Sequence, residues 1–176
     1  MSNQDRDEQD KRRLHGVADQ VLKMLAGDMY TLRQQRGVSN EEMDAVYALA
    51  HGYYRAGRLD EAEQAFLFLC LFEHLESKYW IGLGAVQQMK HDYAKALASY
   101  SYASVIDFRN PRALYYGTEC HLALGHLDDA QETLSALLAV CPADTEEGQR
   151  WRARAEQLQA QVERLRQRGG SDAPQA

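Results

Sequence analysis

Hydrophobic residues recur three and four positions apart between residues 44 and 140, with no stretch of alternating apolar and polar residues. This spacing places them on one side of a helix, whereas alternation would be typical of a strand. Asn110 followed by Pro111 is typical of a helix start, because asparagine caps free N–H groups and proline suits the first helical position. Gly57 and Gly125 stand where helices are expected to end and turn. The pattern predicts an all-α protein built from short helices.

A period of 34 residues runs through the same stretch, because Ala62, Ala96 and Ala130 lie 34 positions apart. Large side chains stand four positions after each alanine and sixteen positions before it. Small residues let two antiparallel helices approach, and large ones fill the space beside them. This is the tetratricopeptide spacing. We therefore predict three tetratricopeptide helical hairpins forming a short superhelix, with an N-terminal helix and a C-terminal capping helix.

Residues 65–72 contain no polar side chain, although the surrounding sequence is rich in charge. A helix exposed to water on one side needs only one apolar stripe. In stacked repeats, the second helix of a hairpin packs against its own first helix and against the next repeat. We therefore predict that this run belongs to the second helix of the first repeat and is buried on two or more sides.

The two ends of the chain have a different character from the repeats. The predicted organisation is a disordered tail at 1–13, an N-terminal helical region at 14–37, repeats within 41–144 (43–76, 77–110 and 111–144), a C-terminal helix at 145–168 and a second disordered tail at 169–176.

Both terminal helices carry an apolar stripe. The first stripe predicts either a cap over the first repeat or a dimer contact, and both interpretations stay open. The second follows a short heptad rhythm and predicts a helix whose seam covers the last repeat. The first stripe comprises Leu14, Val17, Val21 and Leu25, and the second comprises Trp151, Ala155, Leu158, Val162 and Leu165.

The first helices of such repeats line a concave surface with their second, fifth, ninth and twelfth residues. Aromatic and aliphatic side chains dominate these positions, with a few polar groups between them, which is typical of a peptide-binding groove. An extended peptide of about six to nine residues would fit, since it covers about 3.3 Å per residue. Alternatively, Tyr47 and Tyr54 pack against the N-terminal helix. The predicted lining is Asp44, Tyr47, His51, Tyr54, Lys78, Ile81, Ala85, Gln88, Arg112, Tyr115, Glu119 and Leu122.

Composition and charge narrow the choice of partner and compartment. Residues 41–144 hold 15 acidic and 7 basic side chains, which disfavours nucleic acid as a principal partner. No apolar run approaches the roughly 20 residues that a membrane span needs. The first residues lack the pattern of a secretory signal, and the three cysteines form no CxxC motif. Together these features predict a cytoplasmic protein in a reducing compartment.

The sequence contains no recognisable catalytic, cofactor-binding or metal-binding motif. No glycine-rich phosphate loop is present, and the six histidines do not stand at metal-ligand spacing, His121 and His126 being five apart. Cys120 and His121 are adjacent, but consecutive helical residues point in different directions. We therefore predict no enzymatic activity, no cofactor and no metal site.

The stretch from Glu41 to about Val140 resembles the class II chaperones of bacterial type III secretion systems, which hold hydrophobic translocator proteins. The resemblance implies a three-repeat groove that binds an extended, proline-containing translocator segment, with groove positions at Tyr47, His51, Tyr54 and Phe72. It also implies dimerisation and sometimes a role in gene regulation. It rests on Leu69-Cys70, Glu73-His74, "GLGA" at 82–85, "SYSYA" at 99–103, Asp107, Pro111-Arg112, and Glu119-Cys120 with Leu122 and Gly125.

The resemblance predicts that the protein keeps translocators soluble and competent for export before secretion. His51 departs from the family pattern, in which an aromatic or other bulky group is common, so the identity of the client stays open. An alternative is a repeat scaffold or regulatory protein that binds folded partners through its termini or its convex face.

Overall fold

The computed structural model describes the backbone of residues 31–171 and the side chains of residues 31–168. The predicted tail at 1–13, the dimer-contact residues Leu14, Val17, Val21 and Leu25, and the end of the chain after residue 171 lie outside the described residues. The chain divides into two compact units, residues 1–39 and 40–176.

The described part of the first unit is a short helix, α2 (Leu32–Arg36). A capping box begins it: the Thr31 hydroxyl accepts from the Gln34 backbone N–H, and the Gln34 side chain accepts from the Thr31 N–H. Gly37 ends it in the left-handed conformation, with φ of 66°.

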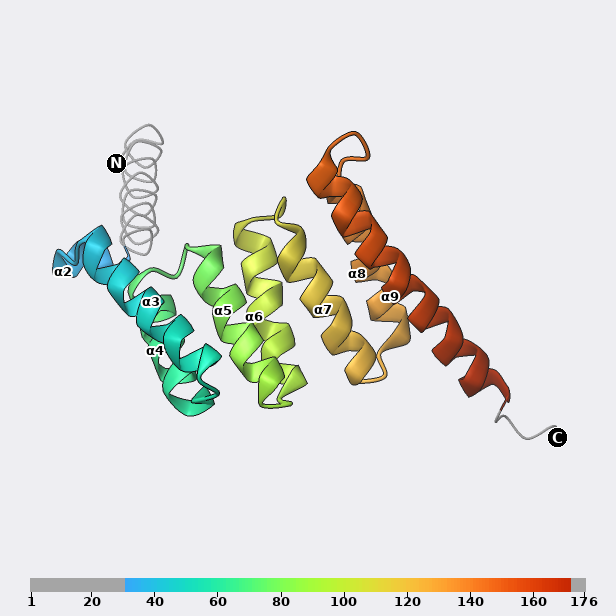
Figure 1. The fold of residues 1–176 in the computed structure, drawn as a ribbon, viewed down its shortest axis with the longest axis horizontal. Helices are drawn as coiled ribbons and strands as arrows, with labels where there is room; N and C mark the ends of the chain where they lie inside the picture. The colour runs from blue at the N-terminus through green and yellow to red at the C-terminus, as the bar shows by residue number, and fades with distance from the viewer. Residues whose placement is uncertain (1–30, 172–176) are drawn as a thin grey trace, which may run out of the picture. The chain divides into compact units, whose positions relative to one another are not determined.

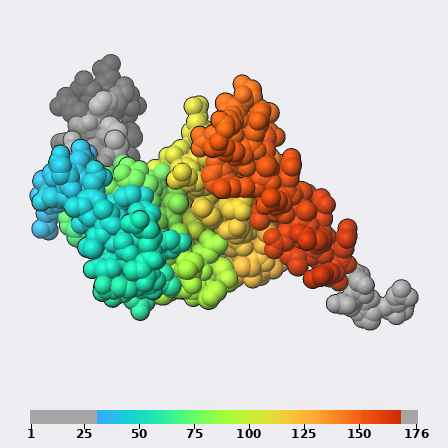
Figure 2. All heavy atoms as spheres, in the orientation of Figure 1, coloured from blue at the N-terminus to red at the C-terminus, as the bar shows by residue number. Residues whose placement is uncertain are grey.

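The described residues of the second unit are all helical or in short turns, which confirms the predicted fold class (Figure 1). Each helix packs against the next one in the chain, and α3, α5, α7 and α9 also contact one another in that order. In the space-filling view the hairpins and α9 follow one another from cyan through yellow to red (Figure 2). The helices are α3 (Asn40–Arg55), α4 (Leu59–Phe72), α5 (Ser77–Met89), α6 (Tyr93–Ile106), α7 (Pro111–Ala123), α8 (Leu127–Val140) and α9 (Glu146–Ser171).

The turns within the three hairpins use the residues that the local chemistry requires. Gly57 and Gly125 adopt φ of 72° and 76°, which costs a glycine little because it has no Cβ. His91 occupies the equivalent turn of the second hairpin with φ of 61°. At the start of α7, the Asn110 side chain accepts a hydrogen bond of 3.1 Å from the Arg112 backbone N–H.

The alternation of small and large residues at the 34-residue period builds the core. Ala62, Ala96 and Ala130 are completely buried. The large side chains four positions later, Phe66 and Leu134 among them, are buried as well. These pairs hold the two helices of each hairpin together, which is why the spacing was informative.

The apolar run on α4 is only partly buried. Phe66, Leu69 and Cys70 lie in the core, whereas Leu71 is 61% exposed and Phe68 is also exposed. The run is therefore buried on two sides, as predicted, while one side of α4 stays exposed. The neighbouring helices α3 and α5 cover two sides of α4, and no described helix covers the third.

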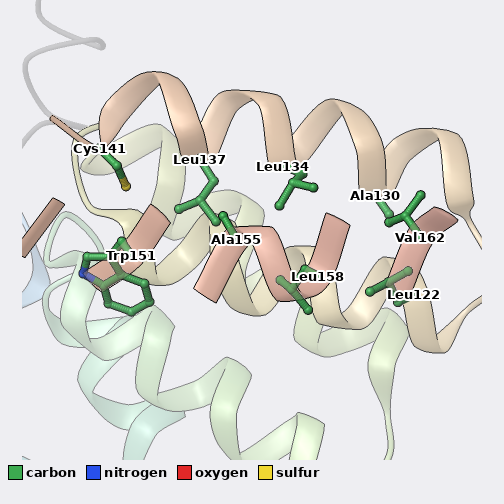
Figure 3. Close-up of a cluster of buried hydrophobic side chains, with 9 residues drawn as sticks. All are labelled: Leu122, Ala130, Leu134, Leu137, Cys141, Trp151, Ala155, Leu158 and Val162. Carbon is green, nitrogen blue, oxygen red and sulfur yellow. The ribbon is translucent and has the colours of Figure 1, made fainter. Parts of the chain in front are cut away.

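The long helix α9 closes the core at the end of the third hairpin, as predicted (Figure 3). Trp151, Ala155, Leu158 and Val162 are buried against residues of α7 and α8. Arg152 adds two hydrogen bonds, donating to the carbonyl oxygens of Cys141 at 2.9 Å and Leu138 at 3.1 Å. These bonds satisfy carbonyl groups at the end of α8 that the helix itself leaves free. None of the helices among the described residues is both long enough and apolar enough to span a bilayer.

We expect the thiols of the folded protein to resist alkylation at neutral pH. Cys70, Cys120 and Cys141 are free and buried. Burial raises the pKa of the Cys70 and Cys120 thiols to about 12, so little of the reactive thiolate forms. Mass spectrometry after a short exposure to iodoacetamide should find the three thiols unmodified in buffer and all modified in guanidinium chloride. Rapid labelling of Cys70 in buffer would instead show that the packing of α4 opens readily.

Candidate peptide-binding groove

A cavity of about 620 Å³ opens along α3, α5 and α7 in the second unit. Eight of the residues predicted to line a concave groove do line it, which brings them together from three helices. They are Tyr47, His51, Tyr54, Lys78, Ile81, Ala85, Gln88 and Arg112. Further lining comes from Gly82, Met89, His91, Tyr93, Tyr100, Asn110 and Tyr116.

One wall of the groove is an aromatic cluster in which two rings of α3 pack against Phe66 of α4. The Tyr47 ring lies 4.5 Å from the His51 ring, and the centroids of these two rings lie 6.0 and 5.4 Å from that of Phe66. Burial, together with the charge of Arg55, lowers the pKa of His51, so its imidazole is neutral at neutral pH. Burial raises the pKa of Tyr47, so its hydroxyl is neutral too. This wall therefore offers flat, uncharged rings to a ligand.

A chain of hydrogen bonds ties the floor of the groove together across three helices. Gln88 of α5 donates from Nε2 to Oε2 of Glu119 on α7 at 3.0 Å. Its Oε1 accepts a bond of 2.9 Å from the hydroxyl of Tyr100 on α6. Burial raises the pKa of Tyr100, so this hydroxyl stays a donor at physiological pH. Because each partner comes from a different helix, the floor is held rigid before any ligand binds.

The charged groups of the lining are cationic. Lys78 places its Nζ 5.3 Å from the centre of the Tyr47 ring and 3.9 Å from Oδ1 of Asp44. Arg112 lies at the exposed start of α7. No carboxylate is found among the described residues that line the groove, although residues 41–144 are acidic overall. The lining is thus mostly apolar and aromatic with two cationic side chains, while the carboxylates of Asp44 and Glu119 lie beside Lys78 and Gln88.

Five predicted groove residues are not part of the lining. Asp44 lies beside Lys78, with its Oδ1 3.9 Å from the Lys78 Nζ. Tyr115 and Leu122 pack with α8 and α9 in the terminal core, where the Tyr115 ring lies 5.6 Å from that of Trp151. The rule that the second, fifth, ninth and twelfth residues of each first helix line the groove fails there. The reason is that α9 contacts α7 in the way that α7 contacts α5, so α9 covers that face of α7. Glu119 supports Gln88, as described above. Phe72 stacks on Phe68 at 4.2 Å, away from the described lining.

The positional rule also missed lining residues that do not lie on first helices. Tyr93 and Tyr100 belong to α6, and His91 lies in the turn before it. Tyr100 reaches the groove because Gly84 of α5 carries no side chain: a Cβ there would lie 2.7 Å from Tyr100 Cε1. The sequence signal that could have identified Tyr100 is a glycine on the first helix of a hairpin combined with an aromatic residue on its second helix.

Comparison with known proteins places this fold among chaperones. Residues 43–74 and 77–110 match the tetratricopeptide repeat family. Low calcium response locus protein H of Yersinia pestis is 33% identical over 104 residues, which make up 59% of this chain and 62% of that protein. The matched stretch thus spans less than two thirds of that relative's length.

Two solved relatives match over more of their length. PcrH from Pseudomonas aeruginosa is 35% identical to this chain, with a TM-score of 0.66. The match covers 71% of this chain and 94% of PcrH. PcrH has also been solved in complex with the chaperone binding region of PopB. The Yersinia enterocolitica type III secretion chaperone SycD, solved with a peptide of the translocator YopD, is 29% identical with a TM-score of 0.67, over 75% of this chain and 98% of SycD. The chain shares the three-hairpin fold with PcrH and is 35% identical to it over 94% of the PcrH chain. It therefore belongs to the class II chaperones of type III secretion systems.

Proposed function

We propose that the protein is a cytoplasmic chaperone that binds an extended segment of a hydrophobic translocator in the groove of α3, α5 and α7. The observation that carries the proposal is the lining of that groove: uncharged aromatic rings on one wall, a rigid polar floor and cations at the edge. PcrH and SycD, which share the fold, were solved with segments of PopB and YopD. The protein acts by binding and needs no chemical step.

The dimensions of the groove suit a short unfolded segment. Helices pack about 8–10 Å apart, so three first helices separated by their partners span roughly 20–30 Å. A chain in extended conformation covers that distance with about six to nine residues. A segment containing proline suits such a groove, because it is already extended and loses little conformational entropy on binding.

The biological need follows from the chemistry of the client. A translocator carries apolar segments that insert into membranes, and such surfaces associate nonspecifically when they are exposed in water. Binding one extended segment keeps the client soluble and prevents it from folding into a form that cannot be exported. Six to nine residues make a small interface, so the complex is expected to be released readily at secretion.

A second candidate function, docking of a folded partner through the outer face, is favoured by a separate observation. Val105 and Phe108 at the end of α6 are 80% and 66% exposed, and Leu71 of α4 is exposed as well. Large apolar side chains that are exposed to water can take part in an interaction surface. This function would make the protein a scaffold and would leave the groove without a role.

Co-expression with a translocator, followed by limited proteolysis, tests the first function against the second. We expect a soluble complex in which one client segment of about six to nine residues resists the protease. Failure of every translocator to form a soluble complex, or protection of a folded client domain in place of a short segment, would contradict the groove proposal.

A further inference from the structure

Three side chains able to bind a metal ion meet at the turn between α7 and α8. His121 lies in the last turn of α7, His126 immediately precedes α8, and Asp129 lies in the first turn of α8. One potential ligand atom from each lies within 4.8 Å of the other two. The site is on the third hairpin, and none of the three residues lines the groove.

The backbone of the turn holds the two histidines in place. Gly125 adopts φ of 76°, and the His126 N–H donates to the His121 carbonyl oxygen at 2.9 Å. The Gly125 N–H donates to the Leu122 carbonyl oxygen at 3.1 Å, which closes the end of α7. The His126 carbonyl oxygen in turn accepts from the Ala130 N–H, at 2.9 Å. The donor side chains therefore converge because of local backbone bonding, before any ion is bound.

One of the donor atoms has no partner. In the part of the chain that the structure describes, Nδ1 of His121 is a buried side-chain nitrogen without a hydrogen bond. Its nearest charged neighbour, Oδ2 of Asp129, lies 3.9 Å away, which is too far for a hydrogen bond. Buried polar atoms nearly always have a partner, and an ion is one recognised explanation of an exception. Oδ2 of Asp129 also lies 4.0 Å from Nδ1 of His126, so both imidazoles face the same oxygen.

The donor set selects the metal. Two imidazole nitrogens and one carboxylate oxygen suit Zn²⁺, whereas Mg²⁺ and Ca²⁺ require mostly oxygen ligands. Zinc–nitrogen bonds of about 2.0–2.1 Å place tetrahedral ligand atoms about 3.4 Å apart. Closing the two distances to Asp129 to that value needs a shift of about 0.5 Å for each pair. The side chains of His126 and Asp129 are 51% and 62% exposed, so they are free to rotate.

We propose that His121, His126 and Asp129 form a three-ligand site for Zn²⁺, completed by water, which fastens α7 to α8. The adjacent Asp128 is not part of the site, because its Oδ1 accepts from Arg166 of α9 at 2.7 Å.

Calorimetric titration of the untagged, chelator-treated full chain with ZnCl2 tests the proposal. We expect binding of one Zn²⁺ per chain and a rise in Tm that grows with zinc concentration. His126→Ala and Asp129→Asn should each weaken binding at least tenfold, because each removes a ligand from an exposed position without disturbing the core. With Co²⁺ as a probe, the visible absorption of a tetrahedral site should be lost in His126→Ala.

The matched control is His91→Asn, which removes the exposed histidine from the equivalent turn of the second hairpin. Asparagine tolerates the positive φ of this position, so the variant should fold and bind Zn²⁺ like the wild type. Undetectable binding by the wild-type chain would overturn the proposal, as would equal affinity in His126→Ala and Asp129→Asn. Equal affinity in those variants would place the ion on other histidines of the chain.

Discussion

Replacing the two groove tyrosines of α3, Tyr47→Ala with Tyr54→Ala, should lower the affinity for a translocator segment at least tenfold. Buried aromatic anchors at the centre of an interface commonly contribute about 2 kcal/mol or more each, so the loss of two exceeds what the remaining lining can offset. Both rings line the groove on the α3 side. Fluorescence anisotropy with a labelled client peptide, mapped beforehand by protease protection, measures the change.

Loss of two tyrosines could also act through stability, so the control removes two that lie elsewhere. Tyr53 lies under the guanidinium of Arg58, 4.6 Å from its ring centre, and Tyr102 packs 4.4 Å from the Trp80 ring. Neither lines the groove, so Tyr53→Ala with Tyr102→Ala should leave affinity within about twofold, as expected for residues outside an interface.

A third variant, Ala85→Trp, fills the groove without removing any packing and should also prevent binding. If the client binds this variant and the Tyr47/Tyr54 variant as tightly as the wild type, it does not occupy the groove. The scaffold function would then be the better account.

Gly82→Ala should lower the free energy of unfolding by about 1–3 kcal/mol, the range for an overpacked core. A Cβ at this position would lie 2.1 Å from Cε1 of Phe66. Phe66 cannot move aside easily, because it is buried beneath the rings of Tyr47 and His51. Urea denaturation followed by circular dichroism measures the loss. Movement of Phe66 would also displace the aromatic wall, so we expect weaker client binding as well.

The same substitution at Gly52 is the control. A Cβ on Gly52, inside α3, meets no atom within 4 Å. Alanine favours the helix by about 0.5–1 kcal/mol over glycine when nothing obstructs it, so Gly52→Ala should raise the free energy of unfolding. Opposite signs for the two variants would confirm that close packing, and not helix propensity, requires glycine at position 82. A stabilised Gly82→Ala variant would contradict this explanation.

Much of the fold could be predicted because it depends on local spacing. The period of apolar residues identified helices, and the 34-residue repetition of Ala62, Ala96 and Ala130 identified hairpins, since both patterns are set by the geometry of a single helix pair. Eight groove residues followed from the same rule, because equivalent positions of stacked first helices face the same way. The prediction that no metal site exists rested on linear spacing too, and linear spacing does not record where the chain reverses. His121 and His126 converge only because the chain reverses at Gly125.

By itself, the sequence determined the helical hairpins, their order and the first helices that line the groove. The tertiary structure alone decided which faces stay accessible. It placed α9 over Tyr115 and Leu122, left one side of α4 open, and brought Tyr100 of α6 to the groove floor to meet Gln88. The physical reason is that the burial of a side chain depends on which helix packs against it, and that helix can be far away in the sequence. A residue's spacing within its own helix records only which way it points, not what it meets there.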